Sequence, residues 1–177
     1  MNHDGTIRSL AARRRLPDSH LARWLAMDSG SRAALLDIAE RLKLRTGQLV
    51  AAIDLLDEIC VREGERPTAI LSRDSVRRAA NGSGSAPARA AAFIDALRAI
   101  RFPRLRRAME RMASELAALR LPAGIEVVLP KDLHSDELMV RLQAKTGREM
   151  RRLIESLVDR KAGLVQLAEM LSGDDEV

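Results

Sequence analysis

Through most of the chain, apolar residues recur at the 3.6-residue spacing of amphipathic helices. The spacing predicts helices over residues 18–25, 32–43, 46–63, 88–100 and 104–119, with short helical turns around 69–71 and 74–80. Leucine, alanine, isoleucine, valine and methionine supply these apolar positions, and most of them have good helix propensity. We therefore expect a mainly α fold.

The last third of the chain follows another pattern. Residues 124–129 form a short apolar run between two prolines, and residues 137–144 alternate apolar and polar side chains. Both patterns are typical of β-strands, and residues 130–136 have about the length of a loose hairpin loop. Thr146 and Glu149 form a capping box that opens a long terminal helix. The pattern predicts a two-stranded antiparallel sheet covered by that helix.

Composition shifts along the chain predict its division into parts. Residues 1–17 look like a flexible basic arm that ends in three arginines, Arg13, Arg14 and Arg15. The Asn-Gly-Ser-Gly-Ser run predicts a linker over residues 82–87. It would separate a helical unit (18–81) from a unit that combines a helical hairpin with the strand–strand–helix part (88–172). Residues 173–177 form an acidic tail.

Bulk composition excludes several classes of protein. With 46% hydrophobic residues the chain is too apolar to be disordered, and 2% aromatic residues provide few platforms for stacking single-stranded bases. Cys60 is the single cysteine, so neither an intrachain disulfide nor a cysteine-based zinc site is possible. No run is apolar enough to span a membrane. We expect a cytoplasmic protein, associated with the nucleoid if it binds DNA.

Residues 38–50 have the spacing of a helix-turn-helix unit, with small Ala39 where two helices would approach. The residues at the start of its second helix that could reach DNA are Arg45, Thr46 and Gln48. Lys43 occupies the turn position that is usually glycine, and acidic residues follow along the second helix. A helical hairpin that serves only for packing has the same spacing, so both interpretations stay open.

Six arginines are concentrated between residues 98 and 111, where only Glu110 offsets them. This excess is as large as the net charge of the whole chain, +5. Five of them are predicted to contact nucleic-acid phosphates: Arg98, Arg101, Arg104, Arg107 and Arg111. A solvated helix face without function is the alternative.

Two apolar rows predict self-association. One lies on the helix at 104–119 and the other recurs every seven residues along the terminal helix. The predicted dimer or partner interface consists of Leu105, Met109, Met112, Leu116, Met150, Leu157, Leu164 and Leu171. Alternatively, these rows pack within one chain. Homodimers are the commonest oligomers, and they are the partner state that we expect.

Catalytic and metal-binding chemistry finds no support in the sequence. His3, His20 and His134 are far from one another and from Cys60 along the chain. No glycine-rich phosphate loop is present, because the Gly82–Ser85 run lacks the Gly-Lys-Ser/Thr ending. We therefore expect no enzyme activity, no cofactor and no metal.

Residues 38–50, followed by the strand–strand–helix order from Gly124 to Leu157, resemble two parts of the chromosome-partitioning ParB family. In that family a helix-turn-helix domain precedes a small C-terminal dimerisation domain. The resemblance implies DNA contact by Arg45, Thr46 and Gln48 and a C-terminal dimer. The family's nucleotide-binding region has no counterpart in this chain, so CTP binding is not implied.

Together these features predict a non-enzymatic accessory DNA-binding or nucleoprotein-assembly protein that acts as a dimer. The alternative is an adaptor or regulatory subunit. In that case the helical row at 105–119 and the acidic helix at 46–63 would dock a partner protein.

Overall fold

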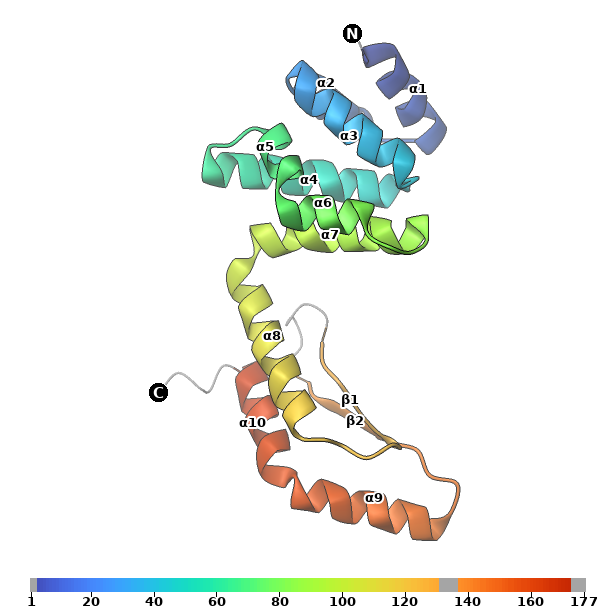
Figure 1. Cartoon of the computed structure of the whole chain (residues 1–177), viewed down its shortest axis with the longest axis vertical. Coiled ribbons are helices and arrows are strands. Elements are labelled where there is room, and N and C mark those ends of the chain that lie inside the picture. The colour runs from blue at the N-terminus through green and yellow to red at the C-terminus, as the bar shows by residue number, and fades with distance from the viewer. Residues whose placement is uncertain (1–2, 131–136, 173–177) are drawn as a thin grey trace. The chain divides into compact units, whose positions relative to one another are not determined.

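The computed structural model describes residues 3–130 and 137–172. Figure 1 shows an almost entirely helical chain with a single two-stranded sheet in the described part. The helices are α1 (Asp4–Arg14), α2 (Asp18–Ala26), α3 (Ser29–Arg41), α4 (Thr46–Glu63), α5 (Pro67–Ser72), α6 (Asp74–Asn81), α7 (Ala86–Arg101), α8 (Pro103–Ala118), α9 (Gly147–Asp159) and α10 (Lys161–Ser172). The strands are β1 (Ile125–Val128) and β2 (Met139–Leu142). The predicted fold class is confirmed.

The chain divides after Phe102 into unit 1 (Met1–Phe102) and unit 2 (Pro103–Val177). The predicted linker at 82–87 is therefore not the domain boundary. Helix α7 packs on α4 and α6 and buries Phe93, Ile94 and Leu97 in the core of unit 1. The glycine- and serine-rich run is only the turn between α6 and α7. The predicted helical hairpin is wrong for the same reason, since α7 and α8 belong to different units.

Residues 1–17 do not form a flexible arm over their described part. They contain α1, which buries Ile7, Leu10 and Ala11 in the core of unit 1, and Leu16 is buried just beyond its end. The prediction failed because α1 has little net amphipathic character: arginines surround its few apolar residues. Tertiary packing, not the pattern, stabilises this helix.

A hydrogen-bonded network around a buried serine joins α3 to α5. Asp28 caps α3 by accepting from the Ser31 amide (3.0 Å) and from the Ser31 hydroxyl (2.6 Å). The Ser31 oxygen in turn accepts from the Thr68 amide at 3.1 Å. Ser31 is fully buried, and its hydrogen bonds offset the cost of removing its hydroxyl from water. These hydrogen bonds lower the pKa of the Asp28 carboxyl.

Unit 2 is built on the sheet and three helices. The strands pair antiparallel, with Ile125 opposite Leu142 and Val127 opposite Val140, so these four apolar residues share one face. Helix α8 packs on α10 around a small core of Met112, Leu167 and Leu171.

The long C-terminal helix is present, but it is divided at Arg160 into α9 and α10. The Arg160 guanidinium donates to the Leu119 carbonyl at 2.8 Å and so ties this bend to the end of α8. The predicted seven-residue row therefore does not lie on one straight helix. The predicted hairpin loop, including His134, and the acidic tail fall on residues 131–136 and 173–177, outside the described residues.

We predict that Asp28→Ala lowers the free energy of unfolding by about 1 kcal/mol at neutral pH, because α3 loses its N-cap. The Asp28 pKa is lower when folded than its ordinary value of 3.8, so the carboxylate stabilises the fold above that value. This contribution is lost as the pH falls below it. Denaturant unfolding from pH 7 to pH 3 should show the difference between wild type and variant shrinking with acidification. Asp95→Ala, which removes an exposed carboxylate, serves as the control; a pH-independent difference for Asp28→Ala would contradict the prediction.

Candidate nucleic-acid interface

Helix α4 is the second helix of the predicted helix-turn-helix unit, the one that would recognise DNA. It is the central helix of unit 1. It contacts α2, α5 and α7, and buries Leu49, Ile53, Leu56 and Ile59 among other residues. No residue from Gln48 to Asp57 is exposed. A recognition helix needs a free face along its length to lie in the major groove. Only the two ends of α4 are accessible, so the α3–α4 pair serves as a packing hairpin.

The acidic side chains of α4 are paired within unit 1. Arg23 of α2 donates to Asp54 (2.7 Å) and to Asp57 (2.6 Å). These partners, Asp54 first, raise the pKa of the Arg23 guanidinium. Arg101 donates to Glu58 at 2.6 Å. The carboxylates that would repel a phosphate surface are thus neutralised by the fold itself.

The three residues predicted to reach DNA differ in availability. The Gln48 side chain accepts from the Arg45 amide at 3.0 Å, and the Thr46 hydroxyl donates to the Arg14 carbonyl. Both side chains are therefore engaged in fixing the start of α4. Arg45 is exposed and has no ion pair among the described residues.

The six arginines between residues 98 and 111 are divided between the two units. Arg98 and Arg101 belong to unit 1, and the other four belong to unit 2. Arg98 pairs with Asp95 at 3.2 Å, and Arg101 pairs with Glu58 and lies 4.8 Å from the ring centroid of Phe102. The prediction for these two arginines is corrected, because carboxylates of the chain already neutralise them.

Three arginines of α8 remain available, and we call them the α8 arginine row: Arg104, Arg107 and Arg111. All three are exposed, and none forms an ion pair within the described part of the chain. Their spacing of three and four residues places them on one side of α8. Arg106 lies outside the row and pairs with Glu110 at 2.6 Å.

The predicted interface residues are mostly inside unit 2. Met112 and Leu171 are core residues, and Met109 and Leu116 pack against that core. Leu105, Met150, Leu157 and Leu164 are half-buried. The apolar row of α8 therefore holds α8 on α10 and is not a free surface. The prediction that these residues form an intermolecular surface is wrong for Met112 and Leu171.

Other apolar side chains of unit 2 are exposed instead. We call them the exposed apolar set: Met139 (48% exposed), Val140 (38%), Ile154 (48%), Val158 (59%) and Val165 (54%). Sequence analysis missed this set, although Ile154 and Val158 are spaced as neighbours on one helix face. The sequence does not specify which face of each helix or strand packs on the small core of unit 2, and so it does not show which apolar side chains stay exposed.

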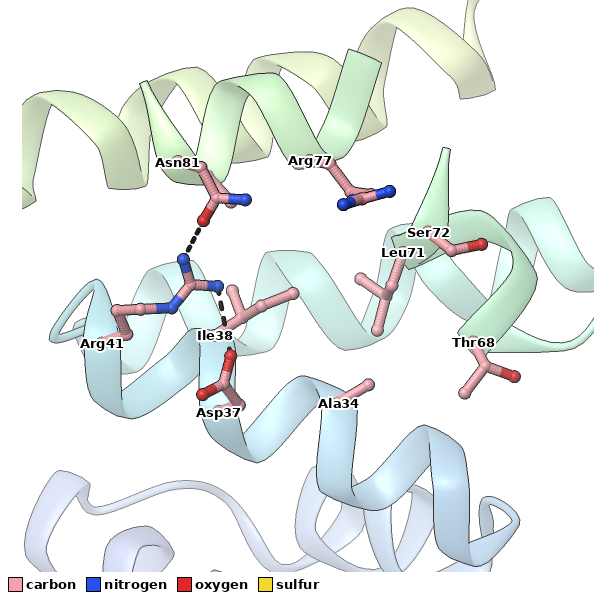
Figure 2. Close-up of a pocket in the computed structure, with 10 residues that line it drawn as sticks. Ala34, Asp37, Ile38, Arg41, Thr68, Leu71, Ser72, Arg77 and Asn81 are labelled. Atoms are coloured by element: carbon pink, nitrogen blue, oxygen red, sulfur yellow. Dashed lines mark hydrogen bonds and ion pairs between the residues drawn. The ribbon is translucent and has the colours of Figure 1, made fainter. Parts of the chain in front are cut away.

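A pocket of about 400 Å³ lies in unit 1 between α3, α5 and α6. Figure 2 shows its apolar lining of Ala34, Ile38 and Leu71, with Arg41 at one end. The Arg41 guanidinium already donates to Asp37 (3.1 Å) and to the Asn81 side chain. The charge of Arg41 is therefore largely satisfied by the chain itself, whereas Arg77, which also lines the pocket, has no ion pair among the described residues.

Among the described residues, no group of three histidine, cysteine or acidic side chains is arranged to hold a metal ion. Cys60 is half-buried on α4, and burial raises the pKa of its thiol. None of the helices in the described ranges is long and apolar enough to cross a membrane.

Comparison with known proteins finds no family model, no curated protein and no solved structure that matches this chain. The resemblance to the ParB family stays a prediction from sequence pattern.

We predict that Arg23→Ala lowers the free energy of unfolding by about 1 kcal/mol, because Asp54 and Asp57 lose their shared partner. The three side chains are partly exposed, so solvent screening keeps the effect small and salt reduces it further. Denaturant unfolding at low and high salt measures both effects. Arg98→Ala, which breaks an exposed pair within one helix, should change stability by less than about 0.5 kcal/mol. Equal effects of the two substitutions would contradict this account of α4.

Proposed function

We propose that the protein is a non-enzymatic accessory DNA-binding protein that acts as a homodimer and contacts duplex phosphates. The observation that carries the proposal is the α8 arginine row: three exposed guanidinium groups on one side of a helix, without acidic partners in the described part of the chain. The opposite side of α8 packs on α10, which fixes the direction in which the row faces.

The row suits phosphate contact. Arg104 and Arg111 are seven residues apart, so the row extends over about 10 Å of helix and can reach more than one phosphate. Each guanidinium can donate two parallel hydrogen bonds to a phosphate, and each contact releases condensed counterions. Binding of this kind depends steeply on salt and carries little sequence information.

The distribution of aromatic residues favours a duplex over a single strand. Trp24 and Phe93 are fully buried, and the exposed ring of Phe102 already lies against the Arg101 guanidinium. Proteins that bind single strands stack bases on exposed aromatic rings. Only contacts to the sugar-phosphate backbone of the nucleic acid remain available, and they suit the regular phosphate array of a duplex.

Unit 2 supports the dimer. Its described residues bury few large apolar side chains, while those of the exposed apolar set remain in solvent. The charges of α9 are also unevenly distributed: Arg148, Arg151 and Arg152 outnumber Glu149 in its first half, and Glu155 and Asp159 lie in its second. Antiparallel pairing of α9 with α9 of a second copy would oppose unlike charges and cover Ile154 and Val158.

The adaptor alternative is less well supported. Of the two surfaces it would use, the α8 apolar row packs on α10, and the acidic residues of α4 are paired with Arg23 and Arg101. The exposed apolar set is the one feature that favours docking of another protein. A dimer covers the same set. For a DNA-binding dimer we expect a cytoplasmic, nucleoid-associated location.

We predict that the full-length chain binds random duplex DNA at low salt. Replacing Arg104, Arg107 and Arg111 by alanine should reduce the slope of log affinity against log salt by about 2.7 for each protomer in contact with the duplex, since each lost phosphate contact contributes about 0.9. Fluorescence anisotropy across a salt series measures this. A triple variant of Arg66, Arg77 and Arg78 removes the same charge from unit 1 and should leave most of the slope unchanged. Equal losses for both triple variants would indicate a net-charge effect, and no binding by wild type would overturn the proposal.

We predict that Val158→Arg converts the dimer to a monomer, because antiparallel pairing would place the new cation against the arginines in the first half of the partner's α9. Sedimentation or light scattering at micromolar concentration measures the mass, and circular dichroism should be unchanged since the side chain is 59% exposed. Val61→Arg is the matched control: Val61 is 87% exposed, but on unit 1. A monomeric wild type, or a Val158→Arg variant that stays dimeric, would contradict the predicted interface.

A further inference from the structure

Two helices of unit 1 end in the same unusual way. The residue after α1 is Arg15 and the residue at the α3–α4 turn is Lys43; both adopt the left-handed conformation, with φ of +53°. In each case the next residue closes the helix by donating to a carbonyl five residues back, Leu16 to Ala11 (2.9 Å) and Leu44 to Ala39 (3.0 Å). Glycine is the favoured residue at this position, because a Cβ is strained there.

A hydrogen bond brings these two helix ends together. The Thr46 hydroxyl at the start of α4 donates to the carbonyl of Arg14, the last residue of α1. The end of α1 and the α3–α4 turn are therefore neighbours in unit 1 (Figure 1). This places five cations in one region, which we call the basic cluster: Arg13, Arg14, Arg15, Lys43 and Arg45.

The basic cluster is accessible and little neutralised. Four of its members are exposed and Arg14 is half-buried, and none has an ion pair among the described residues. Glu40 lines a surface recess together with Leu10, Arg13 and Arg14, and Asp18 follows Arg15 by three residues. Five cations against these two carboxylates leave a local excess of positive charge.

The strained positions indicate that the charge has a role. Glycine would relieve the strain at Arg15 and Lys43, yet both positions carry a long cationic side chain. A purely structural explanation exists, because cations are favoured at helix C-termini, and Arg120 after α8 has the same conformation (φ +46°). That explanation also covers Arg13 and Arg14, which lie in the last turn of α1, but it does not account for Arg45, which precedes α4. The two explanations predict different effects on binding.

We propose that the basic cluster is a second phosphate-binding surface for duplex DNA, located on unit 1 and separate from the α8 arginine row on unit 2. Thr46 and Gln48 are engaged in the fold and the rest of α4 is covered, so the cluster contacts the backbone and does not read bases. Each protomer would thus hold a duplex through both of its units. The inference rests on the proposed DNA-binding function and adds the second contact.

Two contacts on one chain have a measurable consequence. Once one unit is bound, the other meets the duplex at a high effective concentration. Affinity should therefore rise steeply once a duplex is long enough to engage both units. Because a dimer already carries two α8 arginine rows, the comparison uses the monomeric Val158→Arg variant: with only one phosphate surface it would show the gradual increase that follows from the number of available sites.

The test compares glycine substitutions at the strained positions of the full-length chain. Arg15→Gly combined with Lys43→Gly should raise Tm, because the left-handed strain is relieved, and should reduce the salt slope of binding to random duplex DNA by nearly 2. Arg120→Gly relieves the same strain in unit 2 and should raise Tm with an unchanged slope. Arg66→Ala with Arg77→Ala removes two unit 1 charges outside the cluster and should also leave the slope unchanged.

The outcomes separate this inference from the proposed function. If the glycine variant keeps the wild-type slope while the variant of the α8 arginine row loses slope, the second surface is ruled out and the proposed function stands. If wild type does not bind at low salt, both fail. If the glycine variant is less stable than wild type, the double variant Arg13→Ala with Arg45→Ala replaces it, since neither of these residues is strained. A salt slope reduced by nearly 2 in that variant supports the basic cluster as a phosphate-binding surface, and an unchanged slope overturns it.

Discussion

The central position of α4 determines the rest of unit 1. Its apolar residues lie on several sides, so α2, α5 and α7 must pack around it to remove them from water. Charged residues of α4 can then occur only at the edges of these contacts. There Arg23 and Arg101 pair with its carboxylates. A helix surrounded in this way cannot lie in a DNA groove, and only its two ends stay accessible.

This packing also decides where the positive charge of the chain is available. Most acidic residues of α4 are used in pairing within unit 1, whereas the cations of the basic cluster and of the α8 arginine row have no such partners in the described part of the chain. The positive charge that gives the chain its net charge of +5 is therefore concentrated in local patches, one on each of the two units. Charge concentrated on rigid helical surfaces attracts a polyanion more effectively than charge distributed evenly.

Unit 2 is under a different constraint. Two strands and three helices of this size cannot enclose a large core, and among its described residues only Met112, Leu153, Leu167 and Leu171 are buried apolar side chains. The exposed apolar set is the consequence. Covering it with a second copy would give unit 2 the core that one chain cannot supply, and would present two α8 arginine rows to one duplex.

The sequence by itself determined the local structure. Helical periodicity and the strand patterns of residues 124–142 predicted most of the elements, because these signals depend on neighbours within a few residues. Tertiary structure decided what the elements do. The role of α1, the boundary after Phe102 and the gathering of Arg13–Arg15 with Lys43 and Arg45 depend on contacts between residues about 30 or more positions apart. Likewise, the fold decides whether an arginine is free or paired, because it brings a distant carboxylate to some arginines, as it brings Glu58 to Arg101. No local sequence pattern specifies such a pair.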